Sequence, residues 1–145
     1  MKDYKEINFD MDGTIADLYA VDGWLEDLRA FNPRPYQEAK VKVNMSRLAR
    51  LIHKAQRNGY KVNIISWLSK CSTTEYDEAV INAKKVWLAK HLPSVQFDKV
   101  VIVAYGTPKS TCGCGVLFAD EEQNRKEWGK GAYTEKEIFE VLAKI

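Results

Sequence analysis

The stretch NFDMDGTIADL, residues 8–18, places two aspartates directly behind a short apolar segment. Apolar and polar residues alternate over residues 5–10, which predicts a first strand there. Asp10 and Asp12 lie at the end of that strand, where Gly13 lets the chain bend sharply. An Asp-Gly turn at the surface is one explanation of this pattern, and a charged site at the edge of a sheet is the other. The ends of the remaining strands decide between the two.

Beyond this stretch, short apolar segments alternate with amphipathic ones. The pattern predicts further strands at 61–66, 99–104 and 115–120, and helices at 46–60, 75–92 and 134–145. This order indicates an α/β fold, in which right-handed crossovers build a parallel sheet covered by helices on both faces. The last helix begins with a capping box formed by Thr134 and Glu137.

Polar residues follow each predicted strand. They are Asp10 to Thr14, Ser66, the segment YGTPK at 105–109, and Asp120 with Glu121. Ligands of open parallel sheets bind beyond the carboxyl ends of the strands, so we expect these residues to meet at one edge of the sheet. Together they favour a charged site over a surface turn.

The segment between the first strand and the helix at residue 46 breaks the alternation. We predict a single domain over residues 1–145, with a core of residues 1–16 and 46–145 and a small helical cap insertion at about 17–45. Within the insertion, a helical spacing of apolar residues runs from Trp24 to Phe31 and is followed by the helix breaker NPRP. An insertion at this point would lie over the carboxyl-end edge of the sheet.

Aromatic residues near this edge have two alternative roles. Those of the insertion are Tyr19, Trp24, Phe31 and Tyr36. They either pack the insertion onto the core, which we slightly favour, or stack on a flat leaving group. Trp67, next to Ser66, is ambiguous in the same way, so Trp24 and Trp67 are our candidate substrate-binding aromatic residues.

Composition and charge exclude several classes of function. The 22 basic and 20 acidic residues give a net charge of +2, which offers no attraction to a nucleic acid polymer or an anionic membrane. There is no secretory signal and no apolar run near the ~20 residues of a membrane span, so we expect a cytoplasmic protein. The 3 cysteines are expected to be reduced thiols, and a zinc site around CGC at 112–114 is the weaker alternative.

The predicted strand ends carry the groups of a phosphoryl-transfer site. Asp10 and Asp12 repel each other at this spacing, and a hard cation such as Mg²⁺ would relieve the repulsion. The acidic pair at 120–121 supplies further oxygen ligands, whereas Ser66 and Lys109 are donors suited to phosphate oxygens. An acidic metal site beside a lysine and a hydroxyl is typical of phosphoryl transfer.

These residues resemble the motifs of the haloacid dehalogenase (HAD) superfamily. DMDGT at 10–14 is similar to motif I, Ser66 to the motif II hydroxyl residue, Lys109 to the motif III lysine, and LFADE at 117–121 to the acidic motif IV. Within the superfamily, the chain looks most similar to the small nucleotidase-like phosphatases, whose cap lies between motifs I and II. Their Asp-Asp-x-x-Asn ending is similar to DEEQN, with Asn124 in the last position.

The resemblance implies a Rossmann-like HAD fold and a Mg²⁺-dependent phosphatase. Asp10 would be the nucleophile that forms an aspartyl-phosphate, and Asp12 the general acid and then the general base. A second aspartate implies phosphate esters as substrates rather than carbon–halogen bonds, because an alkoxide leaving group needs a proton. The implied metal ligands are Asp10, Asp12 through its backbone carbonyl, Asp120 and Glu121. The implied phosphate-binding residues are Thr14, Ser66 and Lys109.

Several positions depart from the family pattern or leave a choice. Glu121 replaces the aspartate of many relatives, and its longer side chain is expected to reach the metal through water. Asn8 lies inside the first strand, where an apolar residue is usual. Lys109 is preferred over Lys99 for motif III, because Lys99 precedes its strand and would lie at the opposite edge of the sheet. Asn124 either supports the acidic site, and with it the substrate, or caps a turn.

The sequence therefore predicts a Mg²⁺-dependent phosphomonoester hydrolase, with nucleoside monophosphates as candidate substrates. One alternative is a phosphotransferase of the same fold that passes the phosphoryl group to another alcohol. The other is a non-catalytic phosphate-binding or regulatory module. The complete set of catalytic residues favours turnover over binding alone, and the expected partner is a small phosphomonoester, not a nucleic acid polymer or a membrane.

Overall fold

The computed structural model describes residues 5–145, so the first four residues of the predicted core lie outside the described residues. A five-stranded sheet forms the centre, with the order β5-β4-β1-β6-β7 and every neighbouring pair parallel. The strands are β1 (Glu6–Phe9), β4 (Lys61–Trp67), β5 (Lys99–Val103), β6 (Val116–Phe118) and β7 (Ala132–Tyr133). The predicted parallel sheet and its four strands are confirmed. The two-residue β7 escapes prediction because so short a segment has no periodicity.

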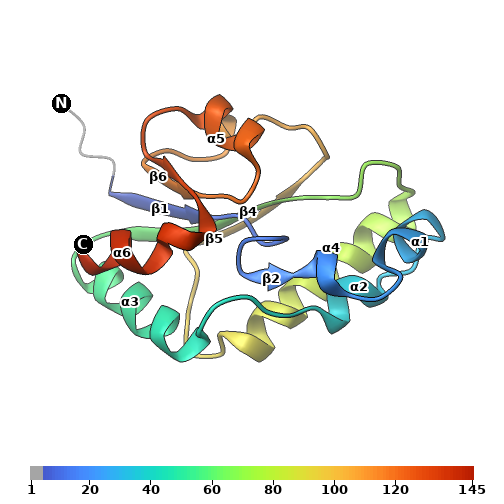
Figure 1. Cartoon of the computed structure of the whole chain (residues 1–145), viewed down its shortest axis with the longest axis horizontal. Coiled ribbons are helices and arrows are strands. Elements are labelled where there is room, and N and C mark those ends of the chain that lie inside the picture. The colour runs from blue at the N-terminus through green and yellow to red at the C-terminus, as the bar shows by residue number, and fades with distance from the viewer. Residues whose placement is uncertain (1–4) are drawn as a thin grey trace.

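Helices cover both faces of the sheet, as expected for this α/β fold. They are α3 (Met45–Arg57), α4 (Thr74–His91), α5 (Glu122–Trp128) and α6 (Ile138–Ala143). Figure 1 shows α3 and α6 on one face and α5 on the other. The predicted capping box precedes α6: the backbone N–H and the hydroxyl of Thr134 donate to Glu137 at 3.0 and 3.1 Å. α5 was not expected, because its sequence EQNRKEW has no apolar stripe.

The main core lies between the sheet and the helices α3, α4 and α6. On β1, Ile7 and Phe9 belong to one buried cluster with Leu48 of α3, Trp87 of α4 and Ile138 of α6. The alternation of β1 turns these two side chains to one face, and the helices close over that face with their apolar stripes. This packing holds β1 at the centre of the sheet and fixes the position of the residues that follow it.

Asn8 faces the other side of β1 and is buried for a specific reason. Its side-chain amide donates to the carbonyls of Cys114 and Val116, at 2.7 and 3.0 Å. Its side-chain carbonyl accepts from the amide of Asn63 at 3.0 Å. An apolar residue at this position would leave the irregular segment before β6 without these bonds. Asn8 therefore anchors the chain that leads to the acidic end of β6.

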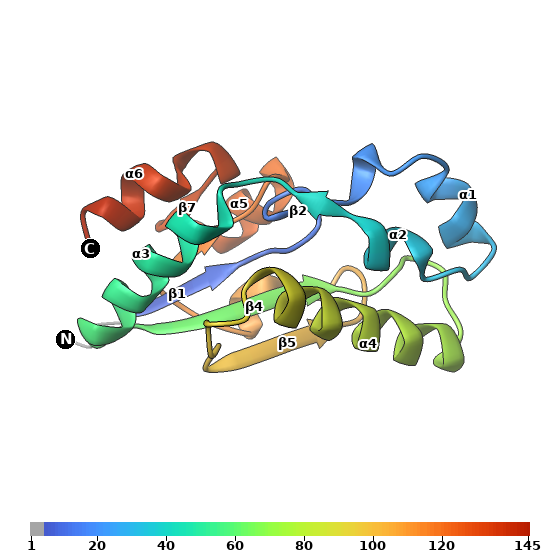
Figure 2. The ribbon, with the colours of Figure 1, turned by 90° about the horizontal axis from the view of Figure 1, so that it is seen from below.

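The predicted cap insertion, residues 17–45, lies beyond the carboxyl ends of the strands (Figure 2). Its elements are β2 (Ala16–Asp17), η1 (Leu18–Ala20), α1 (Trp24–Arg29), α2 (Arg34–Glu38) and β3 (Lys40–Val41). The first residue of β2, Ala16, belongs to the predicted core. The helical pattern from Trp24 to Phe31 is longer than the helix: α1 ends at Arg29, and Phe31 has a φ of 57°. NPRP does not only break α1; it begins α2, because proline is tolerated in the first turn of a helix.

The second half of this cap segment is fixed to the core by α4. The hydroxyl of Tyr76 donates to the carbonyl of Asn32 at 3.1 Å, and the indole of Trp87 donates to the carbonyl of Ala39 at 2.7 Å. By contrast, α1 has no buried residue. The cap segment is thus firmly attached through α2 and β3, and more loosely through α1.

The cysteines are separate free thiols. Burial and the neighbouring carboxylate of Glu6 raise the pKa of the Cys114 thiol. Within residues 5–145, no helix is both long enough and apolar enough to cross a bilayer.

Candidate active site

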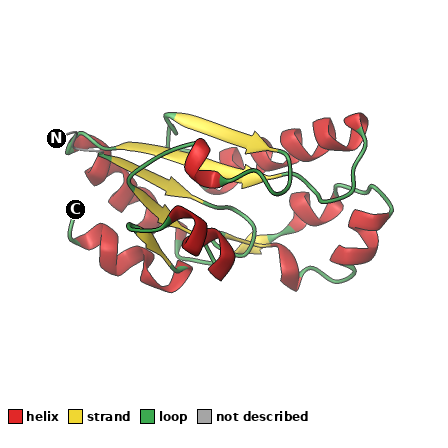
Figure 3. Ribbon diagram, turned by 90° about the horizontal axis from the view of Figure 1, so that it is seen from above, coloured by secondary structure: helices red, strands yellow, loops and turns green. Residues whose placement is uncertain are grey.

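The predicted strand ends lie at one edge of the sheet, beneath the cap segment. The strands in Figure 3 run in the same direction, so the residues that follow them come together. Asp10 and Asp12 follow β1, Ser66 lies at the end of β4, and Asp120 follows β6. Lys109 enters from η2 (Lys109–Thr111), the short helical turn after β5.

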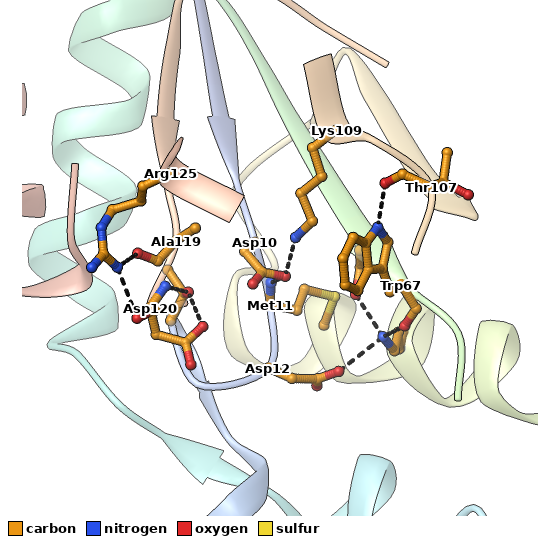
Figure 4. A network of polar contacts seen from close by, with 12 residues as sticks. Asp10, Met11, Asp12, Trp67, Thr107, Lys109, Ala119, Asp120 and Arg125 are labelled. Atoms are coloured by element: carbon orange, nitrogen blue, oxygen red, sulfur yellow. Dashed lines mark hydrogen bonds and ion pairs between the residues drawn. The ribbon is translucent and has the colours of Figure 1, made fainter. Parts of the chain in front are cut away.

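Asp10 and Lys109 form a buried ion pair (Figure 4). The Lys109 ammonium lies 2.8 Å from Oδ1 of Asp10, and the same oxygen accepts the backbone N–H of Met11 at 2.8 Å. The Trp67 ring covers the ammonium, with its centroid 5.4 Å away. Both bonds use Oδ1, so Oδ2 is the oxygen of Asp10 that is left for a substrate or a metal.

A second buried lysine, Lys84 of α4, holds Asp12. Its ammonium lies 3.0 Å from Oδ2 of Asp12, and it donates to the Ser66 hydroxyl at 2.5 Å and to the Trp67 carbonyl at 2.7 Å. Burial raises the pKa of the Asp12 carboxyl, and the charge of Lys84 opposes only part of this rise. A carboxyl with a raised pKa is suited to giving a proton to a leaving group.

Lys84 is not among the site residues predicted from the sequence, although its position in the predicted helix indicates that it is buried. Lys84 lies four residues after Val80 and three before Trp87, on the stripe of α4 that faces the core. A lysine on the buried stripe of a helix needs a buried partner, because an unpaired charge is costly there. The spacing does not reveal the partner, since Asp12 is remote along the chain.

Thr14 is turned toward Asp120. Its hydroxyl donates to Oδ1 of Asp120 at 3.2 Å and accepts the backbone N–H of the same residue at 3.2 Å. Arg125 fixes the turn by donating to the carbonyls of Ala119 and Asp120, at 2.9 and 2.8 Å. Because the Thr14 hydroxyl is already hydrogen-bonded to Asp120, these contacts favour a role for Thr14 in orienting Asp120 over its expected role in binding phosphate.

Gly13 brings the backbone very close to Asp120. Its φ is 81°, and a Cβ at this position would lie 2.2 Å from Oδ2 of Asp120. A larger residue would therefore have to displace either the carboxylate or the turn that carries Asp12 and Thr14. The close approach explains why glycine occupies this position.

Gly13→Ala is expected to lower the free energy of unfolding by about 1–3 kcal/mol, because it adds a clash to an unfavourable backbone conformation. Urea unfolding measures the change. Gly106→Ala is the matched control, since Gly106 has a φ of 86° but no atom within 4 Å of its Cβ position. An equal loss in both variants would show that the approach to Asp120 contributes nothing.

The acidic side of the site fits a hard divalent cation. Burial and the charge of Asp10 raise the pKa of Asp120 to about 6, so the ionised form of Asp120 is unfavourable without a cation to offset it. No group of three His, Cys, Asp or Glu side chains able to hold a metal occurs within residues 5–145. The expected ligand set differs from such a group, because it combines the side chains of Asp10 and Asp120 with the backbone carbonyl of Asp12 and places Glu121 one water molecule away from the ion. Such oxygen ligands suit Mg²⁺.

Glu121 and Asn124 border this acidic group. Glu121 is the exposed N-cap residue of α5, and its charge adds to the rise in the pKa of Asp120. Asn124 is buried inside α5 and does not cap a turn. Both residues line the pocket described next, so Asn124 lies where it can contact a substrate.

A pocket of about 470 Å³ opens over Asp10 and Asp12. The cap segment contributes mostly apolar and aromatic residues to its wall: Leu18, Tyr19, Trp24, Leu25, Leu28 and Tyr36. The core contributes residues 67–70, Tyr105, Lys109, Glu121 and Asn124. The pocket therefore combines a charged floor with largely apolar walls.

The aromatic residues of the cap segment divide between the two expected roles. Phe31 lies outside this pocket and packs on Tyr76, with ring centroids 5.6 Å apart. Tyr36 lines the pocket but is buried, so it also packs the cap segment onto the core. Tyr19 and Trp24 contact each other edge to face at 5.0 Å and lie on the loosely attached part of the cap segment. These two are best placed to contact a ligand.

Comparison with known proteins gives a match in structure only. No family model matches the sequence, and no curated protein does so. Among solved structures, the fold is similar to that of D,D-heptose 1,7-bisphosphate phosphatase from Burkholderia thailandensis. The TM-score is 0.54 and the sequence identity 12%, with 97% of each chain covered. This likeness confirms the predicted α/β fold, a parallel sheet with helices on both faces, over nearly the whole chain.

Proposed function

We propose that the protein is a Mg²⁺-dependent phosphomonoester hydrolase that forms an aspartyl-phosphate on Asp10. One observation carries the proposal: Asp10 and Asp12 are each held through one oxygen by a buried lysine, at the floor of a pocket with apolar walls. A carboxylate with one oxygen fixed and the other free is preorganised for attack or proton transfer. A surface Asp-Gly turn would require neither lysine.

The proposed reaction has two steps. In the first, Oδ2 of Asp10 attacks phosphorus, the bond from phosphorus to the ester oxygen breaks, and Asp12 gives its proton to that oxygen. In the second, Asp12 takes a proton from water while the water oxygen attacks the phosphorus of the aspartyl-phosphate. Inorganic phosphate leaves, and the Asp10 carboxylate is regenerated. Lys109 and the hydroxyl of Ser66 would bind the phosphoryl oxygens in both steps.

Mg²⁺ would be held by Asp10, Asp120 and the backbone carbonyl of Asp12, with Glu121 reaching it through water. When bound there, the ion would supply positive charge to offset that of the phosphoryl group. Thr14 keeps the Asp120 carboxylate oriented for this role.

The walls of the pocket support a flat leaving group, and we infer that nucleoside monophosphates are the preferred substrates of this nucleotidase-like phosphatase. Tyr19 and Trp24 of the cap segment and Trp67 and Tyr105 of the core all line the pocket. Stacking of a base on an aromatic side chain contributes about 1–3 kcal/mol.

The test is phosphate release from a panel of phosphomonoesters with Mg²⁺ present. We expect higher kcat/KM values for nucleoside monophosphates than for hexose phosphates or a sugar bisphosphate. Trp24→Ala is expected to raise KM for the nucleotides about tenfold, which corresponds to the loss of one stacking contact. Phe31→Ala is the matched control, because this aromatic residue of the same segment lies outside the pocket.

Other outcomes identify the alternatives. A phosphotransferase would release more alcohol than inorganic phosphate when a second alcohol is added as acceptor. Binding of Mg²⁺ and phosphate without turnover of any ester would contradict the proposal and favour a phosphate-binding module.

A further inference from the structure

We propose that Lys84 is a positioning residue that directs the free oxygen of Asp12 toward the leaving group. The identity of the site rests on the proposed function. The role of Lys84 within it rests on the contacts of this lysine alone.

Packing does not explain a lysine at this position. Its side chain is 1% exposed on the core-facing stripe of α4, between Val80 and Trp87. Burying an ammonium costs several kcal/mol unless its partners compensate, and replacing a buried ion pair by apolar residues is often neutral or stabilising. An apolar side chain would fill the stripe at lower cost. The lysine therefore has a purpose beyond filling space.

Every proton of the Lys84 ammonium has a hydrogen-bond acceptor. The ammonium has three protons and three oxygen acceptors, which belong to Asp12, Ser66 and Trp67. The ring of Tyr36 lies beside it, with the centroid 5.1 Å away. A group with all its donors engaged is held in one orientation and can hold its partners in turn.

The contact with Asp12 distinguishes the two carboxyl oxygens. Lys84 binds Oδ2, and Oδ1 has no hydrogen-bond partner among the described residues. Asp12 lines the pocket, and its side chain is 17% exposed. Oδ1 is therefore the oxygen that meets the ester. Without Lys84, rotation of the carboxyl group would exchange the two oxygens and weaken the alignment on which proton transfer depends.

The contact with Ser66 sets the direction of its hydroxyl. An ammonium can only donate, so Oγ of Ser66 must accept from Lys84. The proton of the serine therefore points away from Lys84. Ser66 has no exposed surface and is not among the residues that line the pocket, so this contact holds the end of β4 beneath the site. Lys84 thus connects Asp12 to the end of β4.

These contacts predict a specific kinetic signature for Lys84→Met. An aryl phosphate with a strongly acidic leaving group needs little help from Asp12, whereas an alkyl phosphate needs its leaving oxygen protonated. We expect the loss in kcat/KM to be about 10²-fold larger for the alkyl phosphate than for 4-nitrophenyl phosphate. The experiment measures kcat/KM over a series of graded leaving groups with saturating Mg²⁺. Lys85→Met, at the exposed neighbouring position, is the matched control and is expected to retain full activity.

A double-variant cycle with Asp12→Asn tests whether Lys84 acts through Asp12. Adding Lys84→Met to Asp12→Asn is expected to cause no further dependence on the leaving group. A uniform loss in Lys84→Met over all leaving groups, or a steeper dependence in the double variant than in Asp12→Asn, would overturn the inference. If Lys84→Met does not fold, the comparison of Asp12→Asn with the double variant, in which both charges are removed, still decides the question. An inactive wild type would instead overturn the proposed function.

Discussion

Asp10→Asn is expected to reduce kcat/KM for phosphomonoesters by a factor of about 10⁴ or more. The amide has nearly the shape of the carboxylate, but it carries no charge and is a very poor nucleophile toward phosphorus. Its oxygen can still accept from Met11, so the turn after β1 keeps a hydrogen bond that it has in the native protein. The loss should therefore appear in kcat. The thermal stability should also fall, because the buried ammonium of Lys109 loses its charged partner. Steady-state kinetics with 4-nitrophenyl phosphate and thermal unfolding measure the two effects.

Asp22→Asn is the matched control for this variant, because Asp22 is an exposed aspartate of the cap segment and does not line the pocket. It should behave as the wild type. Acid quenching of a reaction with radioactive substrate should also trap phosphate on the native protein and not on Asp10→Asn. Equal activity of Asp10→Asn and wild type would exclude Asp10 as the nucleophile.

Removal of Mg²⁺ with a chelator is expected to lower activity by a factor of about 10³ or more, because the ion contributes several kcal/mol of transition-state stabilisation. Burial and the charge of Asp10 already make the ionised form of Asp120 unfavourable. Added Mg²⁺ should therefore stabilise the folded protein, by about 2.7 kcal/mol at one hundred times its Kd. Thermal unfolding with and without the ion measures this effect independently of turnover.

Asp120→Asn should remove most of this stabilisation, since the amide is a weaker ligand and carries no charge. Glu122→Gln is the control: Glu122 lies two residues away, pairs on the surface with Lys126 and does not line the pocket. A Mg²⁺-induced stabilisation of the same size in wild type and Asp120→Asn would place the ion elsewhere. Full activity after exhaustive chelation would contradict the requirement for a metal.

The sheet and the approximate place of the site were predictable because the relevant signals are local. Each strand is a short apolar segment that ends in a polar residue, and parallel strands bring such ends together. The same rule predicts which of two lysines lies in the site. Lys99 begins β5 at the opposite edge of the sheet, whereas Lys109 follows β5 and lies 2.8 Å from Asp10. Only the order of polar residues and strands was needed for these predictions.

The remaining features depend on contacts between distant parts of the chain. Asn8 is unexpected in a central strand until Cys114 and Val116 are seen to accept its amide protons. Lys84 looks like an ordinary helix lysine until α4 packs it beneath Asp12. Partners such as these are chosen by tertiary packing, so residue spacing alone does not identify them.

The uneven attachment of the cap segment bears on how this protein could acquire new substrates. Trp87 and Tyr76 tie the segment down near Ala39 and Asn32, on the same helix that supports Asp12 through Lys84. α1 lines the pocket and has no fully buried residue, although its Leu28 packs against the buried cluster that contains Leu18 and Tyr36. If the proposed function holds, mutations in α1 should therefore alter which leaving groups are accepted, with less effect on folding than mutations in the buried core and no direct effect on the residues proposed for phosphoryl transfer. Libraries randomised in α1 alone would then be a starting point for directed evolution of the proposed activity.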